Sequence, residues 1–255
     1  MQKFILLFLI LTTALSAADN RRLLNLSPAL WTPLSSANLR GWGDCSDPTK
    51  VAVSGSNITT VTDKSPNAYT WTASATAPTL VTSVQNGLST CRFAASTYLT
   101  GASGTNLTIG TECALAKASS LAQFNALLMH GLVIADNALT LEVGAGANKL
   151  DLWYDGVGSR APTGAGSIVT GTWYRVCVTL DTSPLATIYI NAVSASTTTQ
   201  AGGIIKTTNF NISKDNGANF TAWIGDIGEW AIDTGTGNSF VTNIDTYWKA
   251  KWNLP

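Results

Sequence analysis

The chain has 255 residues, with 15 basic and 15 acidic side chains and a charged fraction of only 12%. A chain of this length can bury a stable core without metal ions or disulfides, and all-β folds of this size often form one domain. The formal net charge of zero argues against a basic surface of the kind that binds nucleic acid or anionic membranes.

The first 18 residues, MQKFILLFLILTTALSAA, have the order of segments found in a secretory signal. One lysine precedes an apolar and threonine-containing stretch from Phe4 to Leu15, and small residues follow it. A helix over that stretch would rise about 18 Å, well short of the roughly 30 Å core of a bilayer. We therefore expect cleavage after Ala18, no membrane span afterwards, and export to the extracellular space or the cell surface. An interfacial anchor or an uncleaved core segment is the alternative.

Residues 19–38 are predicted to form an extended arm, because Pro28 and Pro33 disfavour a helix and no steady hydrophobic period is present. From residue 39 onward, short runs rich in Val, Ile, Thr, Tyr and Trp alternate with clusters of Gly, Asn, Ser and Pro. No helical pattern separates these runs. The pattern predicts one all-β domain over residues 39–255, built as a sandwich or a barrel.

Alternation inside single runs indicates strands with two different faces. In the run of residues 172–181, Val176 and Val178 share one face of the predicted strand, and Arg175 and Cys177 share the other. An apolar inner face and an outer face toward water or a ligand explain this pattern.

Only the C-terminal residues change to a helical period. Phe240, Ile244 and Trp248 recur at helical spacing, and Asn238 or Ser239 can cap the first turn. We expect a short α-helix over residues 238–252 that lies with its aromatic face on the sheet. Its lysines should remain in water or lay their stems along the apolar surface. A sugar platform is the other use of such aromatics, but the helical spacing favours packing.

The four cysteines form no CxxC pair and fit no zinc-binding spacing. Cys91 and Cys177 lie inside strand-like runs, where cysteine behaves as a small buried hydrophobic residue. We expect free buried thiols. An oxidising compartment would permit disulfides, but the spacing does not say which cysteines would pair.

Several segments resemble motifs of concanavalin A-like, laminin-G-like jelly-roll domains. The opening motif and the following turn motif are matched by Trp42, Asp44, Ser46 and Asp47, and by Val61, Asp63, Lys64, Ser65 and Asn67. Val61 stands where the family motif has Trp, and Pro66 stands where it has Gly. Later motifs are matched by Trp173, Val176, Val178 and Asp181, by residues 187–193, and by residues 223–235 with the C-terminal helix.

The resemblance covers residues 39–255 in the order of the family motifs. It implies a two-sheet antiparallel jelly-roll sandwich with a short C-terminal α-helix. Domains of this kind occur in secreted and surface proteins of bacteria and in phage fibre and tail proteins. They bind sugars, mediate adhesion, hydrolyse glucans or serve structural roles, so the fold does not decide the function.

The sequence predicts no catalytic site. Retaining glycosidases need two carboxyl groups about 5 Å apart, and the glucanases of this superfamily place them in a Glu–x–Asp–x–Glu run that this chain lacks. Asp226 and Glu229 are three residues apart, which in an extended strand sends them to opposite faces. His130 is the single histidine, so a serine triad and a multi-histidine metal site are also disfavoured.

The candidate ligand site is Asp151, Trp153 and Asp155, which alternate with Leu150 and Leu152 along one predicted strand. Asp151 and Asp155 would stand roughly 13 Å apart, too far for paired acid and base catalysis. An aromatic ring between two carboxylates suits contact with a sugar ring and its hydroxyl groups. Packing of Trp153 under a loop is the alternative.

No cofactor is required by the sequence, although related domains often bind Ca²⁺ through loop carboxylates. The candidate ligands are Asp44, Asp47 and Asp215, and loop hydrogen bonding is the competing interpretation for all three.

These observations favour a secreted, non-catalytic jelly-roll module that binds a cell-surface glycan or a protein receptor. A structural phage virion protein, such as a fibre, tail or capsid decoration that contacts copies of itself or other virion proteins, is the second hypothesis. A divergent glycan hydrolase is the third.

Overall fold

The computed structural model describes the chain from residue 31 to residue 255, except residues 103–108, 123, 132–138, 145–147, 155–158, 161–162, 165, 182, 184, 200–208, 215–220 and 236–237. The predicted signal segment and most of the predicted arm therefore lie outside the described residues. Pro33 begins a short 3-10 turn, η1 (Pro33–Ser35), at a position that proline tolerates. In the described part of the chain, no helix is both long enough and apolar enough to cross a bilayer.

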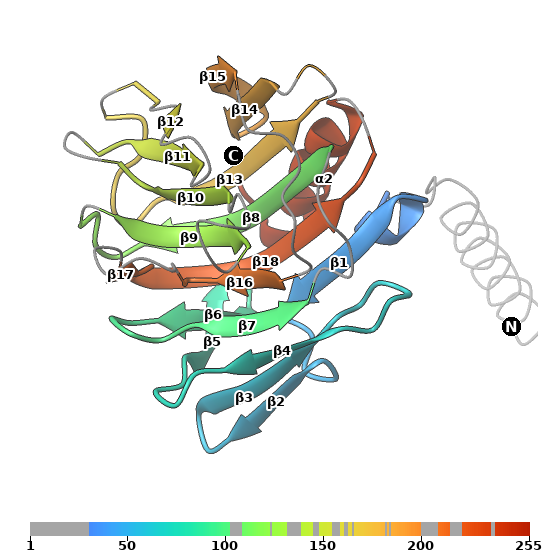
Figure 1. Ribbon diagram of the computed structural model, residues 1–255. Coiled ribbons are helices and arrows are strands. Elements are labelled where there is room, and N and C mark those ends of the chain that lie inside the picture. Colours follow the sequence, from blue (N-terminus) through green and yellow to red (C-terminus); the bar gives the residue numbers. More distant parts are fainter. Residues whose placement is uncertain are drawn as a thin grey trace, which may run out of the picture. The chain divides into compact units, whose positions relative to one another are not determined.

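The strands form two layers, and nearly all neighbours within a layer are antiparallel (Figure 1). The first layer is ordered β15–β14–β13–β8–β18, and the far edge of β18 pairs with both β1 and β6. Its strands are β1 (Leu39–Asp44), β5 (Thr79–Gln85), β6 (Leu88–Phe93), β8 (Gly110–Ala118), β13 (Trp173–Leu180), β14 (Leu185–Ile190), β15 (Val193–Thr199) and β18 (Gly225–Asp233).

The second layer is ordered β2–β3–β4–β7–β16–β9–β10–β11–β12, and Figure 1 shows these strands following one another across one side. They are β2 (Val51–Ser54), β3 (Asn57–Thr62), β4 (Thr70–Ala73), β7 (Leu99–Ala102), β9 (Asn125–His130), β10 (Leu139–Val143), β11 (Leu150–Tyr154), β12 (Ser159–Arg160) and β16 (Asn209–Ile212). The short β17 (Thr221–Ala222) adds a parallel pair with β9. The predicted two-sheet antiparallel sandwich is confirmed.

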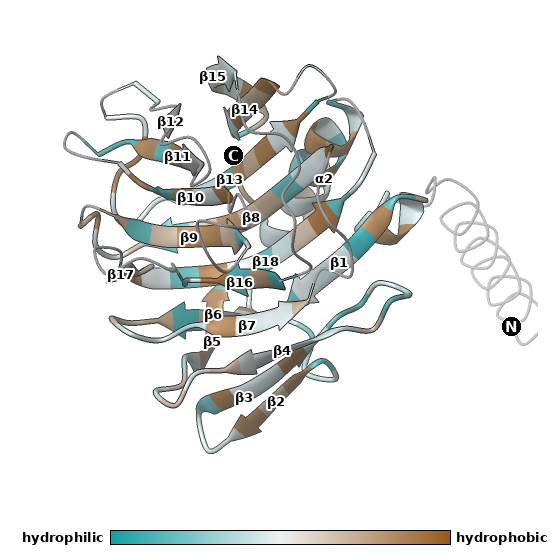
Figure 2. Ribbon diagram, in the orientation of Figure 1, coloured by the Kyte–Doolittle hydropathy of each residue, from teal (hydrophilic) through white to brown (hydrophobic). Residues whose placement is uncertain are grey.

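The core lies between the layers, and the predicted alternation places it there. Val176 and Val178 of β13 belong to the core, as do Leu150 and Leu152 of β11. Figure 2 shows the same alternation as hydrophobic bands separated by more polar residues along the strands. Each layer thus has an apolar inner face and an outer face of different composition.

Two tryptophans join the layers at the centre of the core. The ring of Trp71 from β4 meets the ring of Trp230 from β18 edge to face, with centroids 5.2 Å apart. Each ring lies across a glycine on the neighbouring strand, Trp230 over Gly43 and Trp71 over Gly101. The missing side chains of these glycines make the space that the two large rings need.

The C-terminal helix α2 (Ser239–Trp252) confirms the predicted helix and packs on the outer face of the first layer, against β8 and β13. Its buried side chains include Ile244, Trp248 and Trp252. The predicted side-chain cap is wrong, because no side chain caps the first turn. The amide oxygen of Asn238 instead accepts a hydrogen bond from the Tyr189 hydroxyl at 2.8 Å.

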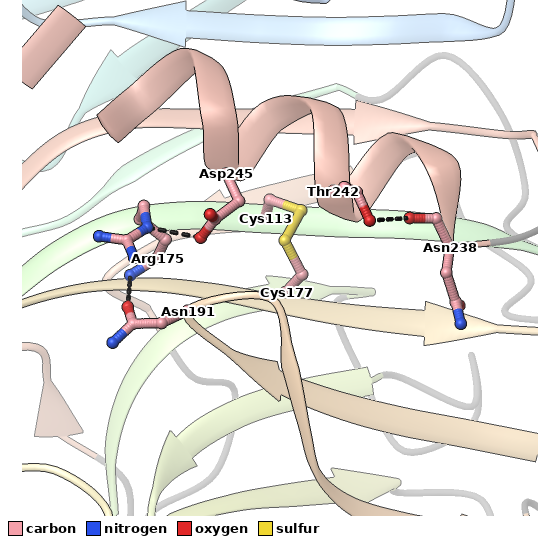
Figure 3. Close-up of a disulfide and its surroundings, with 7 residues drawn as sticks. All are labelled: Cys113, Arg175, Cys177, Asn191, Asn238, Thr242 and Asp245. Carbon is pink, nitrogen blue, oxygen red and sulfur yellow. Dashed lines mark hydrogen bonds and ion pairs between the residues drawn. A yellow bond between two sulfur atoms is a disulfide. The ribbon is translucent and has the colours of Figure 1, made fainter. Parts of the chain in front are cut away.

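The expectation of free thiols is wrong, because the four cysteines form two disulfides, Cys45–Cys91 and Cys113–Cys177. Cys113 and Cys177 stand directly opposite each other on β8 and β13, a register that the sequence spacing did not reveal. Figure 3 shows this disulfide beneath α2, beside the buried ion pair between Arg175 and Asp245. The disulfide and the ion pair both lie on the outer face that alternation assigned to Arg175 and Cys177.

Gly43→Ala should reduce stability strongly, because a Cβ at this position would lie 2.0 Å from Cε2 of Trp230. Overpacking in a core typically costs about 1–3 kcal/mol, and the new methyl group would overlap the buried Trp230 ring. Urea unfolding measures the loss. Gly41→Ala on the same strand is the matched control, because its nearest contacts are ordinary at 3.4 Å. Equal stability of the two variants would contradict the account of the core.

Candidate functional site

A polar network lies under α2 on the outer face of the first layer. The two carboxylate oxygens of Glu229 accept hydrogen bonds from the indole nitrogens of Trp252, at 2.6 Å, and Trp42, at 2.8 Å. The ammonium group of Lys251 lies 2.9 Å from Glu229 and 2.7 Å from Asp44. Burial raises the pKa of Glu229, and the nearby charge of Asp44 adds to that increase. The network joins β1, β18 and α2, and its donors and carboxylates bond to one another.

The motif residues that resembled the family opening build the edge of this network. Asp63 accepts hydrogen bonds from the backbone N–H groups of Trp42 and Ser65, both at 2.7 Å, and so fixes the turn after β3 to β1. Lys64 lies between Asp44 and Asp47, at 2.8 and 3.0 Å. The motif therefore has a structural use in this chain, which its sequence pattern alone did not reveal.

Two of the three candidate calcium ligands, Asp44 and Asp47, are paired with lysine. Burial alone would raise the pKa of Asp44, but Lys251 and Lys64 outweigh burial and hold that pKa below its ordinary value. The Lys64 ammonium occupies the space between the two carboxylates where a cation would be bound. In the described part of the chain, no group of three or more His, Cys, Asp or Glu residues could hold a metal ion. Asp215 lies outside the described residues.

The predicted separation of Asp226 and Glu229 onto opposite faces is wrong. The pairing of β18 with β8 shifts its register between Ile227 and Glu229, and such a bulge breaks the two-residue alternation. Asp226 accordingly lies on the helix side together with Glu229, where it pairs with Arg92 at 2.7 Å and Lys117 at 3.0 Å. Both carboxylates are engaged by cationic or indole donors.

His130, the single histidine, is buried in the sandwich. Its Nδ1 atom lies 2.5 Å from Oε1 of Glu112, a β8 residue that projects inward from the first layer. The imidazole also stands edge-on to the ring of Phe210, with centroids 5.9 Å apart. The pair is a polar contact between the two layers and faces no solvent.

The outer face of the second layer is different, because no described helix covers it. We call this surface the polar face. One cross-strand row runs along it, in which each residue is paired in register with the next: Ala52, Thr60, Thr72, Thr100, Asn211, Met129, Thr140, Trp153 and Arg160. From β2 to β11, neighbouring residues of the same strands belong to the core, which places the row from Ala52 to Thr140 on the opposite side. The row divides into a shielded half and an open half.

The shielded half lies on β16, β9, β10 and β11. Asn211 and Thr140 are fully buried there. Glu142 and Asp151 are paired in register on β10 and β11, and their exposed fractions are only 0% and 3%. Two of the predicted ligand residues, Asp151 and Trp153, thus occupy positions in this half. The side chain of Trp153 and the whole of Asp155 lie outside the described residues.

The open half lies on β3, β4 and β7 and carries a threonine ladder, defined by Thr60, Thr72 and Thr100. The three residues stand opposite one another on adjacent strands, and each is at least partly exposed. At about 4.8 Å between strands the ladder spans roughly 10 Å. In the described part of the chain, none of the three hydroxyl groups bonds to another protein group, so the hydroxyls can serve as donors and acceptors for a ligand.

Tyr98 adjoins the ladder, two residues before Thr100 on the same face. Its backbone is held to Ser74 by two hydrogen bonds, from Ser74 N–H to the Tyr98 carbonyl at 3.0 Å and from Tyr98 N–H to the Ser74 hydroxyl at 3.1 Å. The ammonium group of Lys214 lies over the Tyr98 ring, 4.8 Å from its centroid. The aromatic ring is therefore presented on a fixed strand end with a cation beside it.

Ser213 places Lys214 at that position. Its backbone adopts a left-handed conformation, with φ of 61°, which turns the chain sharply after β16. The buried Ser213 hydroxyl donates to the carbonyl of Thr97 at 3.0 Å and also lies 3.3 Å from the carbonyl of Trp223. These bonds tie Lys214 to the segment that carries Tyr98.

Tyr98, Lys214 and the threonine ladder were not predicted from the sequence. They are spread over residues 60–214, and the strand register alone brings them together. A half-buried aromatic ring, three hydroxyl groups and an ammonium group can bind a polar ring-shaped ligand by stacking and hydrogen bonding. They provide no general acid and base pair.

A family model described as the concanavalin A-like lectin/glucanases superfamily matches residues 94–235, more than half of the chain. No curated protein matches the sequence. Among solved structures, the binding domain of Paraclostridial mosquitocidal protein 1 is similar with a TM-score of 0.56 and 14% identity, over 86% of this chain and 55% of that one. The receptor-binding domain of botulinum neurotoxin D is similar with a TM-score of 0.55 and 9% identity, over 82% and 52%.

A third similar structure is domain 4 of AbnA, an extracellular arabinanase from Geobacillus stearothermophilus, in complex with arabinotriose. Its TM-score is 0.49 and its identity 16%, over 82% of this chain and 98% of that one. At these identities the likenesses concern the fold alone.

Asp47→Asn should reduce the dependence of stability on acid pH. Burial alone would raise the pKa of Asp47, but hydrogen bonds from Thr49 and Lys64 lower it to about 2, from an ordinary value of 3.8. A carboxyl group whose pKa is lowered by folding stabilises the fold above its unfolded pKa, and that contribution is lost as the pH falls through the folded pKa. After allowance for screening, the contribution is about 1 kcal/mol.

Urea unfolding at pH 7 and at pH 2 tests this prediction. The variant should be less stable than the parent at pH 7, and the difference should almost vanish at pH 2. Lys249→Gln on the exposed side of α2 is the control and should show no such convergence. If the free energies of unfolding of Asp47→Asn and the parent differ by the same amount at both pH values, the lowered pKa of Asp47 is refuted.

Proposed function

Because the chain belongs to the concanavalin A-like lectin/glucanases superfamily, we propose that it is an exported, non-catalytic jelly-roll module that binds a cell-surface glycan or a protein receptor through its polar face. The binding surface is the open half with Tyr98, Lys214 and the threonine ladder. The positions of Asp151 and Trp153 continue the same face on the shielded half and remain candidate ligand contacts, together with Asp155.

One observation carries this proposal. On the outer face of the first layer, α2 covers β8 and β13, whereas the second layer presents, beside a fixed aromatic ring, hydroxyl groups that have no partner among the described residues. Aromatic rings stack on the apolar faces of sugars, and hydroxyl groups satisfy the sugar hydroxyls around the ring. The preformed strands mean that little conformational entropy is lost on binding.

The state of the carboxylates supports a binding role without catalysis. Asp226 and Glu229 are held by basic or indole groups, and Glu142 and Asp151 are shielded from solvent. An acid and base pair needs access to substrate and two distinct protonation states. None of these four carboxylates meets both requirements, and none of them lies in the open half.

The two disulfides support export. Disulfides persist in oxidising compartments and are rare in the cytosol, and both described pairs lie in the body of the sandwich. Together with the hydrophobic N-terminal segment, they favour a mature protein that begins near Asp19. N-terminal sequencing of the protein from its native source tests this point, and an intact Met1 would contradict it.

A structural virion protein is the second candidate, and one observation favours it. The edge strand β15 consists of Val, Ser, Ala and Thr, and Val193 is 69% exposed. An uncharged exposed edge can pair with the edge of another copy. Recovery of the protein with intact Met1 in assembled particles, in contact with copies of itself, would favour this role over that of an exported module.

Tyr98→Ala should abolish glycan binding or reduce it at least tenfold, because loss of an aromatic stacking surface removes roughly 1–2 kcal/mol or more. A glycan array with and without Ca²⁺, followed by calorimetry on the best ligand, measures the effect. Thr72→Val should weaken binding less, by removing one hydroxyl contact.

Two further variants locate the ligand and control for folding. Trp153→Ala should reduce affinity if the ligand extends onto the shielded half, and unchanged affinity would confine it to the open half. Val193→Ala on β15 should have no effect on glycan binding. A blank array with and without Ca²⁺, or a Tyr98→Ala variant that binds like the parent, would rule out this site.

A further inference from the structure

The charges of the open half have a single sign at the described positions. Three cross-strand rows meet there: Ala52, Thr60, Thr72 and Thr100; Lys50, Thr62 and Thr70; and Ser74 with Tyr98, beside Lys214. The charged members of this set are Lys50 and Lys214, and none of its members is Asp or Glu. At the described positions of these rows, a ligand therefore meets lysine side chains and no carboxylate.

Lys214 differs from the lysines that stabilise the fold. Lys64, Lys117 and Lys251 each lie within 3.0 Å of at least one carboxylate, so their charges are neutralised internally. In the described part of the chain, Lys214 has no carboxylate partner, and its ammonium group lies over the Tyr98 ring. A cation above an aromatic ring is held near the place where a stacked ligand would lie, and it keeps its hydrogen-bond donors for that ligand.

We infer that the ligand of the open half is an acidic saccharide, a glycan whose sugar carries a carboxylate or a sulfate group. This inference rests on the proposed function and specifies its ligand class. Lys214 binds the anionic group, the sugar ring lies on Tyr98, and the hydroxyls of Thr72 and Thr100 bond to the hydroxyls of the sugar.

The geometry fits a short stretch of glycan. Tyr98 and Thr100 are two residues apart on one strand face, about 7 Å, and Thr100 and Thr72 are neighbours across two strands, about 5 Å apart. An ammonium group that pairs with an anion at a partly exposed site changes affinity by roughly 5- to 20-fold. Lys214 is thus expected to select among ligands, while stacking on Tyr98 and the hydroxyl contacts provide the common part of the affinity.

Matched ligand pairs test the inference on the mature full-length chain. One pair is a tetragalacturonate and its fully methyl-esterified form, which keeps the size and linkage and removes the charge. A second pair is a sulfated galactan oligosaccharide and its desulfated form, which separates sulfate from carboxylate. Calorimetry gives the affinity of each ligand for the parent chain, for Lys214→Gln and for Lys249→Gln, which removes an exposed lysine from α2.

The parent chain should bind at least one acidic ligand fivefold or more tightly than its neutral partner, with a preference that decreases between 50 and 300 mM NaCl. Lys214→Gln should lose that preference with an unchanged melting temperature, and Lys249→Gln should keep it. Equal binding of the acidic and neutral partners, or a preference that survives Lys214→Gln, overturns the inference.

If Tyr98→Ala still abolishes binding in that case, the proposed glycan site stands. Absence of binding to all four ligands contradicts the inference of an acidic saccharide ligand. The glycan array then tests whether the proposed site binds any glycan.

Discussion

The buried carboxylate of Glu229 is the interaction on which the layout of this protein depends. It is fully buried, and isolated burial of a carboxylate costs several kcal/mol unless donors compensate. The donors are the indole groups of Trp42, on β1, and Trp252, on α2, and the ammonium group of Lys251, also on α2. If α2 left this face, the Glu229 carboxylate would lose the Trp252 and Lys251 donors while it stayed buried. The helix is therefore held both by these polar contacts and by the burial of its tryptophans. With α2 held over β8 and β13 in this way, the binding surface that we propose lies on the outer face of the second layer.

The same constraint explains how charge is distributed. Most of the described basic side chains near the helix are paired with Asp44, Asp226, Asp245 or Glu229. These pairs are structural, because they join strands to strands or strands to the helix. The open half of the polar face has no such pairs at its described positions, and its threonine hydroxyls are not used by the fold. The described ion pairs thus gather around α2, whereas the threonine hydroxyls of the open half have no partner among the described residues.

The sequence predicted those features that depend on local periodicity. Alternation in residues 172–181 placed Val176 and Val178 in the core and Arg175 on the other face, and helical spacing placed Trp248 against the sheet. Local periodicity failed where one residue disturbs it: the bulge at Gly228 moves Glu229 to the face of Asp226. It also could not reveal the Cys113–Cys177 disulfide, because the partners are 64 residues apart and meet through strand register. The threonine ladder is hidden for the same reason, since Thr60, Thr72 and Thr100 share no motif.

A formal net charge of zero describes the sum of the side chains and conceals how they are arranged. The composition argues against long polyanions, whose affinity grows with each of many phosphate contacts and needs an extended basic surface. It does not argue against a ligand with one or two anionic groups, for which a single cation beside a stacking ring is enough to change affinity by about tenfold. Lys64, Lys117 and Lys251 contribute nothing to such recognition, because their charge is neutralised within 3.0 Å. Lys214 keeps its charge available because the chain turns at Ser213 and sets it over Tyr98, on the side of the molecule that has no nearby described carboxylate. On the proposed function, the specificity of this nearly neutral protein depends on which of its described charges have no internal partner.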